Sequence, residues 1–140
     1  MNPFQSLPDY EAYIYTLQQQ YSAIRSSTLT VYRHGARVAL VKGEMHFRYG
    51  YRLVVHERLE FESGALRLVR YGYEIWQGQN KLYWYDPQPH PHIPELASTD
   101  PHHKHVSPDI KHNRIPAPDL SFTSPNLPFL IQEIEQLLCQ

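Results

Sequence analysis

The prolines of this chain are concentrated in one stretch, and this limits where regular structure can form. Ten of its twelve prolines and six of its nine histidines lie between residues 87 and 128. Because proline fixes its φ angle and lacks an amide hydrogen, it interrupts helices and the interior strands of sheets. Apolar residues such as Ile93 and Leu120 recur in the stretch, so we expect residues 87–124 to form a long ordered loop on the sheet.

Before that stretch, the periodicity of apolar residues predicts one helix followed by a sheet. Spacings of three and four predict a helix over residues 9–26, which begins at Pro8-Asp9. From Thr28 onward the period is two, and short turns favour sequential antiparallel pairing within residues 28–86. The expected strands, with a break at Lys42-Gly43, are 28–32, 37–41, 45–49, 52–61, 66–76 and 81–86.

A second amphipathic helix is expected over residues 125–139, opened by Ser124-Pro125. A chain of 140 residues can bury a core as one domain without metal or disulfide staples. We therefore predict a single α+β domain over residues 1–140, in which an antiparallel meander of about five or six strands is packed by the terminal helices.

Charge and cysteine content narrow the environment and the partners. The formal net charge is −1, yet residues 25–70 hold nine Lys or Arg against four Glu, so that half of the chain could bind an anionic ligand. The single cysteine, Cys139, excludes an intramolecular disulfide and any multi-cysteine metal site. With no apolar run of about 18 residues and no signal-peptide pattern, we expect a soluble cytoplasmic protein without a membrane partner.

The histidines of the proline-rich stretch carry the strongest chemical signal. An imidazole accepts and donates protons near neutral pH, and cleaving a phosphodiester through its own 2′-hydroxyl needs a base, an acid and a cation. Two histidines with Lys104 or Arg114 could fill these roles. Two other interpretations stay open, a zinc-like site completed by Asp86 or Asp100 and a surface loop without chemistry. The six histidines are His90, His92, His102, His103, His105 and His112.

Glu57 occupies a position where strand alternation predicts an apolar side chain. Leu53, Val55 and Leu59 share its face of the strand. A carboxylate that points into a core must find a partner or change its pKa. Glu57 could be a general base or could orient a histidine of the loop, but a bulge that turns it outward or an ion pair with an arginine of the sheet is an equally physical alternative.

Arginines and tyrosines alternate in the sheet region and could bind a phosphate backbone and stack bases. Cross-strand aromatic pairing beside a solvated cationic face would give the same pattern. The residues concerned are Arg48, Tyr49, Tyr51, Arg52, Arg67, Arg70, Tyr71 and Tyr73.

Residues 82–105, LYWYDPQPHPHIPELASTDPHHKH, resemble the TumE-type toxin family of bacterial toxin–antitoxin systems. The match comprises Tyr85-Asp86 at a strand end, a histidine-bearing loop, and Pro101 to His105. The chain departs from the pattern at His90-Pro91-His92, where adjacent histidines are expected. The resemblance implies a small cytoplasmic growth-inhibiting protein, neutralised by a cognate antitoxin with a DNA-binding helix-turn-helix.

The leading hypothesis is a toxin that cleaves RNA without a metal or other cofactor. The acid–base candidates are His102, His103 and His105, with Lys104 stabilising phosphate charge and Glu57 orienting or deprotonating a histidine. The expected substrate-binding residues are Arg70, Arg114, Tyr83, Asp86 and His92. A non-catalytic module that docks a protein partner and a metal-dependent nuclease or hydrolase are the alternatives, and a homo-oligomeric form stays open.

Overall fold

Alternation along the two longest strands gives the sheet one apolar face and one wet face. In β4 (Tyr51–Glu62), Leu53, Val55 and Leu59 are buried whereas His56 and Arg58 are exposed. β5 (Ala65–Gln77) repeats the pattern, and its pairing with β4 extends along nearly the whole of both strands. The apolar face must therefore be covered by other elements.

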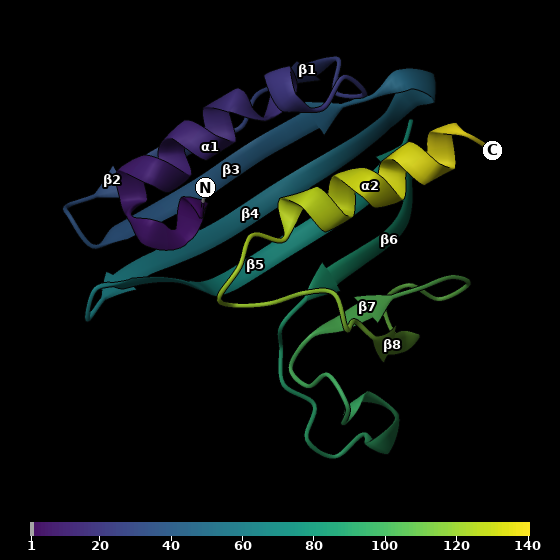
Figure 1. Cartoon of the computed structure of the whole chain (residues 1–140). Coiled ribbons are helices and arrows are strands. Elements are labelled where there is room, and N and C mark those ends of the chain that lie inside the picture. Colours follow the sequence, from purple (N-terminus) through teal and green to yellow (C-terminus); the bar gives the residue numbers. More distant parts are fainter. Residues whose placement is uncertain (1) are drawn as a thin grey trace.

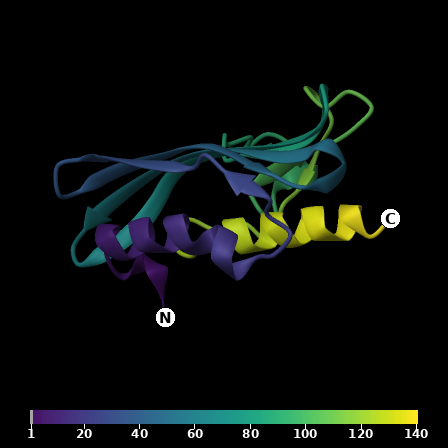
Figure 2. The same cartoon turned by 90° about the horizontal axis from the view of Figure 1, so that it is seen from above.

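Two helices cover that face in the computed structural model, which describes residues 2–140 (Figure 1). Figure 2 shows α1 (Leu7–Gln20) and α2 (Leu127–Leu138) beneath the same face of the sheet. This arrangement confirms the α+β class and the antiparallel sheet packed by terminal helices. Of the helices in residues 2–140, none combines the length and the apolar composition that crossing a bilayer demands.

Within residues 2–140 the sheet has eight antiparallel strands, against the five or six expected. Their order is β1-β3-β4-β5-β6-β7-β8, and β2 pairs with β3 on the same side as β1. The remaining strands are β1 (Ser26–Ser27), β2 (Thr30–His34), β3 (Val38–His46), β6 (Asn80–Asp86), β7 (His103–His105) and β8 (Arg114–Pro116). Three short 3₁₀ turns lie at Pro3–Gln5, Arg48–Gly50 and Pro94–Leu96.

Both helices differ from the sequence prediction at their ends. The Ser6 hydroxyl accepts a hydrogen bond from the Asp9 amide and caps α1, so this helix begins before Pro8. It ends at Gln20 rather than residue 26, because the following residues turn back and the Arg25 amide donates to the carbonyl of His46 at the edge of β3. α2 buries Leu127, Leu130, Ile131 and Ile134 against the sheet.

The strand break predicted at Lys42-Gly43 is wrong, because β3 runs through both residues. Gly43 has a φ of +142°, and a methyl group on its Cα would lie 2.6 Å from the carbonyl oxygen of Thr28. The glycine is needed there because the chain between β1 and β2 approaches β3 closely, not because the strand ends.

The proline-rich stretch is ordered, but it is not wholly irregular. β7 pairs with β6 and β8 pairs with β7, so the meander continues beyond residue 86. Neither three-residue strand has enough residues for a period-two pattern to show in the sequence. The segments that connect these strands, residues 87–102 and 106–113, form the extension below the helices in Figure 1.

Glu57 lies in the core at 3% exposure and connects three elements. The Tyr10 hydroxyl of α1 donates to its Oε1 at 2.6 Å, and the Tyr73 hydroxyl of β5 donates to its Oε2 at 2.5 Å. Asn126, at the start of α2, donates to the Tyr73 hydroxyl at 3.2 Å. Burial raises the pKa of the Glu57 carboxyl above its usual value, and the two tyrosine hydrogen bonds only partly offset this effect.

We predict that Gly43→Ala lowers the free energy of unfolding by about 2 kcal/mol or more, because the added methyl meets backbone atoms that cannot move aside independently. Gly35→Ala is the matched control, since Gly35 also has a positive φ but has open space around it, and should cost about 1 kcal/mol. Urea denaturation of both variants measures the difference. Equal losses would show that the approach of Thr28 does not constrain β3.

We also predict that Glu57 makes the protein less stable as pH rises. The pKa of Glu57 is higher in the folded state than in the unfolded chain, where it is about 4.5. The folded state therefore binds the carboxyl proton more tightly, and this stabilisation is complete below the unfolded pKa and is lost as pH rises through the folded pKa. Glu57→Gln cannot titrate, and its amide can still bond both tyrosines. Denaturation at about pH 4, 5.5 and 7 should show the parent weakening relative to this variant; a pH-independent difference would contradict the prediction.

Candidate functional site

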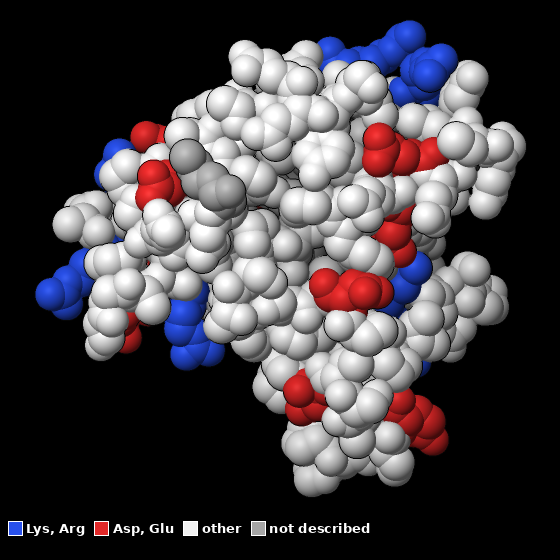
Figure 3. Space-filling model, viewed as in Figure 1, with Lys and Arg blue, Asp and Glu red and all other residues white. Residues whose placement is uncertain are grey.

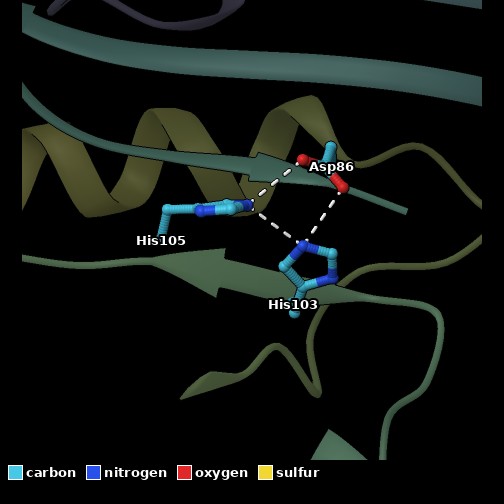
Figure 4. A group of neighbouring side chains, drawn as sticks. All are labelled: Asp86, His103 and His105. Carbon is cyan, nitrogen blue, oxygen red and sulfur yellow. Dashed lines mark hydrogen bonds and ion pairs between the residues drawn. The ribbon is translucent and has the colours of Figure 1, made fainter. Parts of the chain in front are cut away.

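Three side chains at the β6–β7 pairing converge on one point (Figure 4). The Nε2 atom of His103 lies 3.1 Å from Oδ1 of Asp86, and Nε2 of His105 lies 3.2 Å from Oδ2. The two Nε2 atoms are 3.1 Å apart. We call Asp86, His103 and His105 the Asp86 centre.

Strand alternation brings these residues together. Asp86 pairs with His103 and Trp84 pairs with His105 across the antiparallel ladder, so the side chains of all four lie on the face without helices. The Nδ1 atom of His103 lies 3.0 Å from the carbonyl oxygen of Pro101, which fixes the ring. His103 and His105 are 1% and 3% exposed, whereas the side chain of Asp86 is 21% exposed, so the centre is reached from the Asp86 side.

Trp84 packs against one of the two histidines of the Asp86 centre. Its indole stacks on the His105 ring with centroids 3.5 Å apart and planes 6° apart. Lys81 lies over the same indole at 4.6 Å. The indole N–H donates to the carbonyl of Ile110 at 2.9 Å and so ties residues 106–113 to the sheet. Trp84 is therefore a packing residue, not a free surface for stacking a base.

Burial and hydrogen bonds set the charges in the centre. Burial acts to raise the pKa of Asp86, but hydrogen bonds from His103 and the Gln88 amide outweigh it and lower the pKa to about 2. Burial lowers the pKa of His105, although Asp86 opposes this effect. At neutral pH the centre therefore holds an ionised carboxylate beside a neutral His105 imidazole.

The Asp86 centre opens into a hollow on the wet face of the sheet. This hollow, of about 820 Å³, is lined by Asp86, Pro87, Pro101 and Arg70 among others. A neighbouring hollow of about 420 Å³ is also lined by Arg70, Tyr71 and Trp84. It includes Gly72, where no side chain fills the space. We call the two together the open-face groove; its lining includes the cationic side chains of Lys42, Arg58 and Arg70, together with His56 and Glu74.

The opposite face has a different character. Figure 3 shows that most of the helix-covered face is formed by residues other than Lys, Arg, Asp and Glu, with separate patches of Asp and Glu within it and with Lys and Arg mainly along its margins. The cations of the open-face groove lie on the other side because they alternate with the buried core positions of β3, β4 and β5. Of the Lys and Arg residues counted in 25–70, those that line the groove therefore all lie on this one face of the sheet.

Several predicted site residues lie away from the centre. Lys104 alternates with the two histidines and points to the helix side, where its Nζ pairs with Glu133 at 3.3 Å and lies 4.1 Å from the Tyr83 ring centroid. The Tyr85 hydroxyl donates to both oxygens of Glu133 at 2.8 and 2.9 Å. Lys104, Tyr83, Tyr85 and Glu133 thus join β6 and β7 to α2.

The other predicted residues are divided between the two faces. His102 is held by the Tyr71 hydroxyl at 2.6 Å from its Nδ1 and packs on Phe122. Glu57 bonds two tyrosines in the core rather than a histidine. Arg114 pairs with His105 across β7–β8, and His92 is exposed on the loop. Lys42, His56 and Arg58 also line the groove, although they were not among the predicted site residues; their exposed positions alternate with buried residues on β3 and β4, and this alternation is the signal that could have identified them.

A known family matches this chain. The family described as Toxin TumE matches residues 14–138, which is most of the chain and includes all three residues of the Asp86 centre. No curated protein and no solved structure matches the chain. The sequence segment that first suggested this family, residues 82–105, is thus part of a match that also covers the sheet and the closing helix. The chain belongs to the TumE toxin family and is the toxin of a toxin–antitoxin pair, whose partner is an antitoxin.

Proposed function

We propose that this toxin arrests growth by cleaving RNA at the Asp86 centre. The observation that carries the proposal is that the only exposed member of the centre, Asp86, lines a groove on the same sheet face as a set of exposed cations. A phosphodiester bound along the groove would therefore reach the centre at Asp86, with the two buried imidazoles directly behind the carboxylate.

The cations of the groove are arranged in a way that favours an anionic ligand. Arg58 and Arg70 are directly opposite each other on β4 and β5, where like charges repel, and in the described part of the chain Glu60 pairs only with Arg58, at 3.0 Å. Within residues 2–140, neither Lys42 nor Arg70 forms an ion pair. A bound phosphate backbone would offset this repulsion. An open sheet face with exposed cations suits a single-stranded nucleic acid better than a duplex.

The centre offers the chemistry that a phosphodiester needs. Cleavage requires activation of the attacking oxygen and positive charge near the phosphate. His103 and His105, oriented by Asp86 and Trp84, are placed for the first task. Arg70 in the groove and Arg114 beside His105 are placed for the second. Lys104, His102 and Glu57 are bonded elsewhere and have no part in this assignment.

The resemblance to this family also suggests where the toxin acts and what kind of antitoxin neutralises it. An RNA target implies that the toxin acts in the cytoplasm, and the antitoxin that neutralises it would carry a helix-turn-helix. Covering the open-face groove would be the simplest way for such a partner to block cleavage.

The first test is His103→Ala, which should abolish growth arrest and slow RNA cleavage by at least about 100-fold, the effect of losing a proton-transfer or positioning group. His112→Ala is the matched control, since His112 is exposed and pairs only with Asp109. Growth after induction at equal soluble level and the integrity of total RNA are the measurements. Arrest by both variants with intact RNA would sink the proposal and favour the non-catalytic, protein-docking alternative.

The second test is Arg70→Ala, which should weaken binding of a mixed-sequence single-stranded RNA and lower the slope of log Kd against log salt by about 1. Arg25→Ala, an exposed arginine far along the chain from the groove, should leave the slope unchanged. Fluorescence anisotropy in the His103→Ala background avoids cleavage during the titration. An unchanged slope for Arg70→Ala would remove the groove from the proposed binding path.

A further inference from the structure

The Asp86 centre has too few protons for its contacts if all its rings are neutral. A carbonyl oxygen only accepts hydrogen bonds, so the 3.0 Å contact of His103 Nδ1 with the Pro101 carbonyl places the ring proton on Nδ1. The Nε2 atom of neutral His103 is then a bare acceptor. It lies 3.1 Å from Oδ1 of Asp86 and 3.1 Å from Nε2 of His105.

His105 cannot supply the missing hydrogen. A proton on its Nε2 can serve Asp86 Oδ2 or His103 Nε2, but it leaves the contact between His103 Nε2 and Asp86 Oδ1 without any hydrogen. Four acceptor atoms thus share at most one proton in a buried site. One further positive charge must lie between them, either as a second proton or as a bound cation.

The donor set fits a transition-metal ion. The three contacts of 3.1, 3.2 and 3.1 Å match the spacing of about 3.0–3.4 Å between neighbouring ligand atoms around an ion bonded at about 2.1 Å. Two imidazoles with one carboxylate suit zinc, manganese or iron better than magnesium or calcium, which prefer oxygen ligands. Asp86, His103 and His105 thus each offer one ligand atom to a common point, and the three atoms lie within 4.8 Å of one another.

The surroundings hold the rings as a metal site requires. A histidine that binds a metal through Nε2 donates its Nδ1 hydrogen to a carbonyl or carboxylate in most known sites, which is the role of the Pro101 carbonyl for His103. His105 is oriented instead by its stacking on Trp84, since within the described residues its buried Nδ1 has no hydrogen-bond partner.

We propose that Asp86, His103 and His105 bind one divalent first-row transition-metal ion, with its remaining coordination positions directed to the open-face groove. Both histidines are buried, so only the side of Asp86 is accessible to water or a phosphate oxygen. This would replace the metal-independent chemistry first expected of the histidines. The binding site does not depend on RNA being the substrate.

Isothermal titration of chelator-treated full-length protein with ZnCl₂, MnCl₂ and MgCl₂ tests the proposal. We expect one saturable site for Zn²⁺ or Mn²⁺, no comparable site for Mg²⁺, and an affinity lowered by more than about 100-fold in Asp86→Asn, beyond the loss usual for residues outside the ligand set. Asp109→Asn is the matched control, because Asp109 also pairs with a histidine, His112, but at an exposed position without a second ring. Its affinity should equal that of the parent.

Histidine ¹⁵N NMR of the parent during the same Zn²⁺ titration gives a readout that does not rely on a folded variant. The Nε2 signals of His103 and His105 should shift together at one equivalent while that of His112 stays in place. Absence of a one-to-one site, equal affinity in the parent and in folded Asp86→Asn, or shifts spread over exposed histidines would overturn the proposal. These measurements contain no RNA, so a bound metal with intact RNA would refute only the proposed function, and cleavage that persists in chelator without metal binding would refute only the metal site.

Discussion

The pairing of a three-residue strand, β7, with the end of β6 is the constraint on which the candidate site depends. In an antiparallel ladder, residues opposite each other share a face, so this one register places Asp86 beside His103 and Trp84 beside His105. A slip of one residue would move both histidines to the helix side and bring Lys104 to the open face. The ion pair of Lys104 with Glu133 of α2 opposes such a slip, because it secures the intervening residue on the other face.

The buried polar groups of this protein have two separate functions. Glu57 is surrounded by hydroxyl donors from α1 and β5 and lies on the helix-covered face, where it holds the two layers together. The Asp86 centre lies on the opposite face, has fewer hydrogens than its contacts require when both histidines are neutral, and opens to solvent through one carboxylate. A buried acid with satisfied oxygens is a structural element, whereas converging acceptors at the edge of a groove can take a ligand.

The sequence was sufficient to predict the fold class, the two helices and the long strands that became β4 and β5, because each depends on local periodicity or composition. It could not predict β7, since three residues show no period, and without that strand Lys104 could not be separated from His103 and His105. Glu57 was correctly placed on the apolar face, but its tyrosine partners come from α1 and β5, and only tertiary packing shows them. Gly43 was predicted to end a strand, because the sequence alone does not distinguish a glycine that a turn requires from one that a closely approaching segment requires.

The order of the chain has a consequence for its synthesis. Translation releases α1 and the strands through β6 first, and these carry Asp86 but neither of its histidines. His103 and His105 follow only after the proline-rich connection, and α2, which holds Lys104 through Glu133, emerges after both histidines. A nascent chain can therefore assemble most of its sheet on the ribosome while the centre is still incomplete. Asp86 is therefore made well before the two histidines that complete its centre, and the centre forms only when β7 pairs with β6.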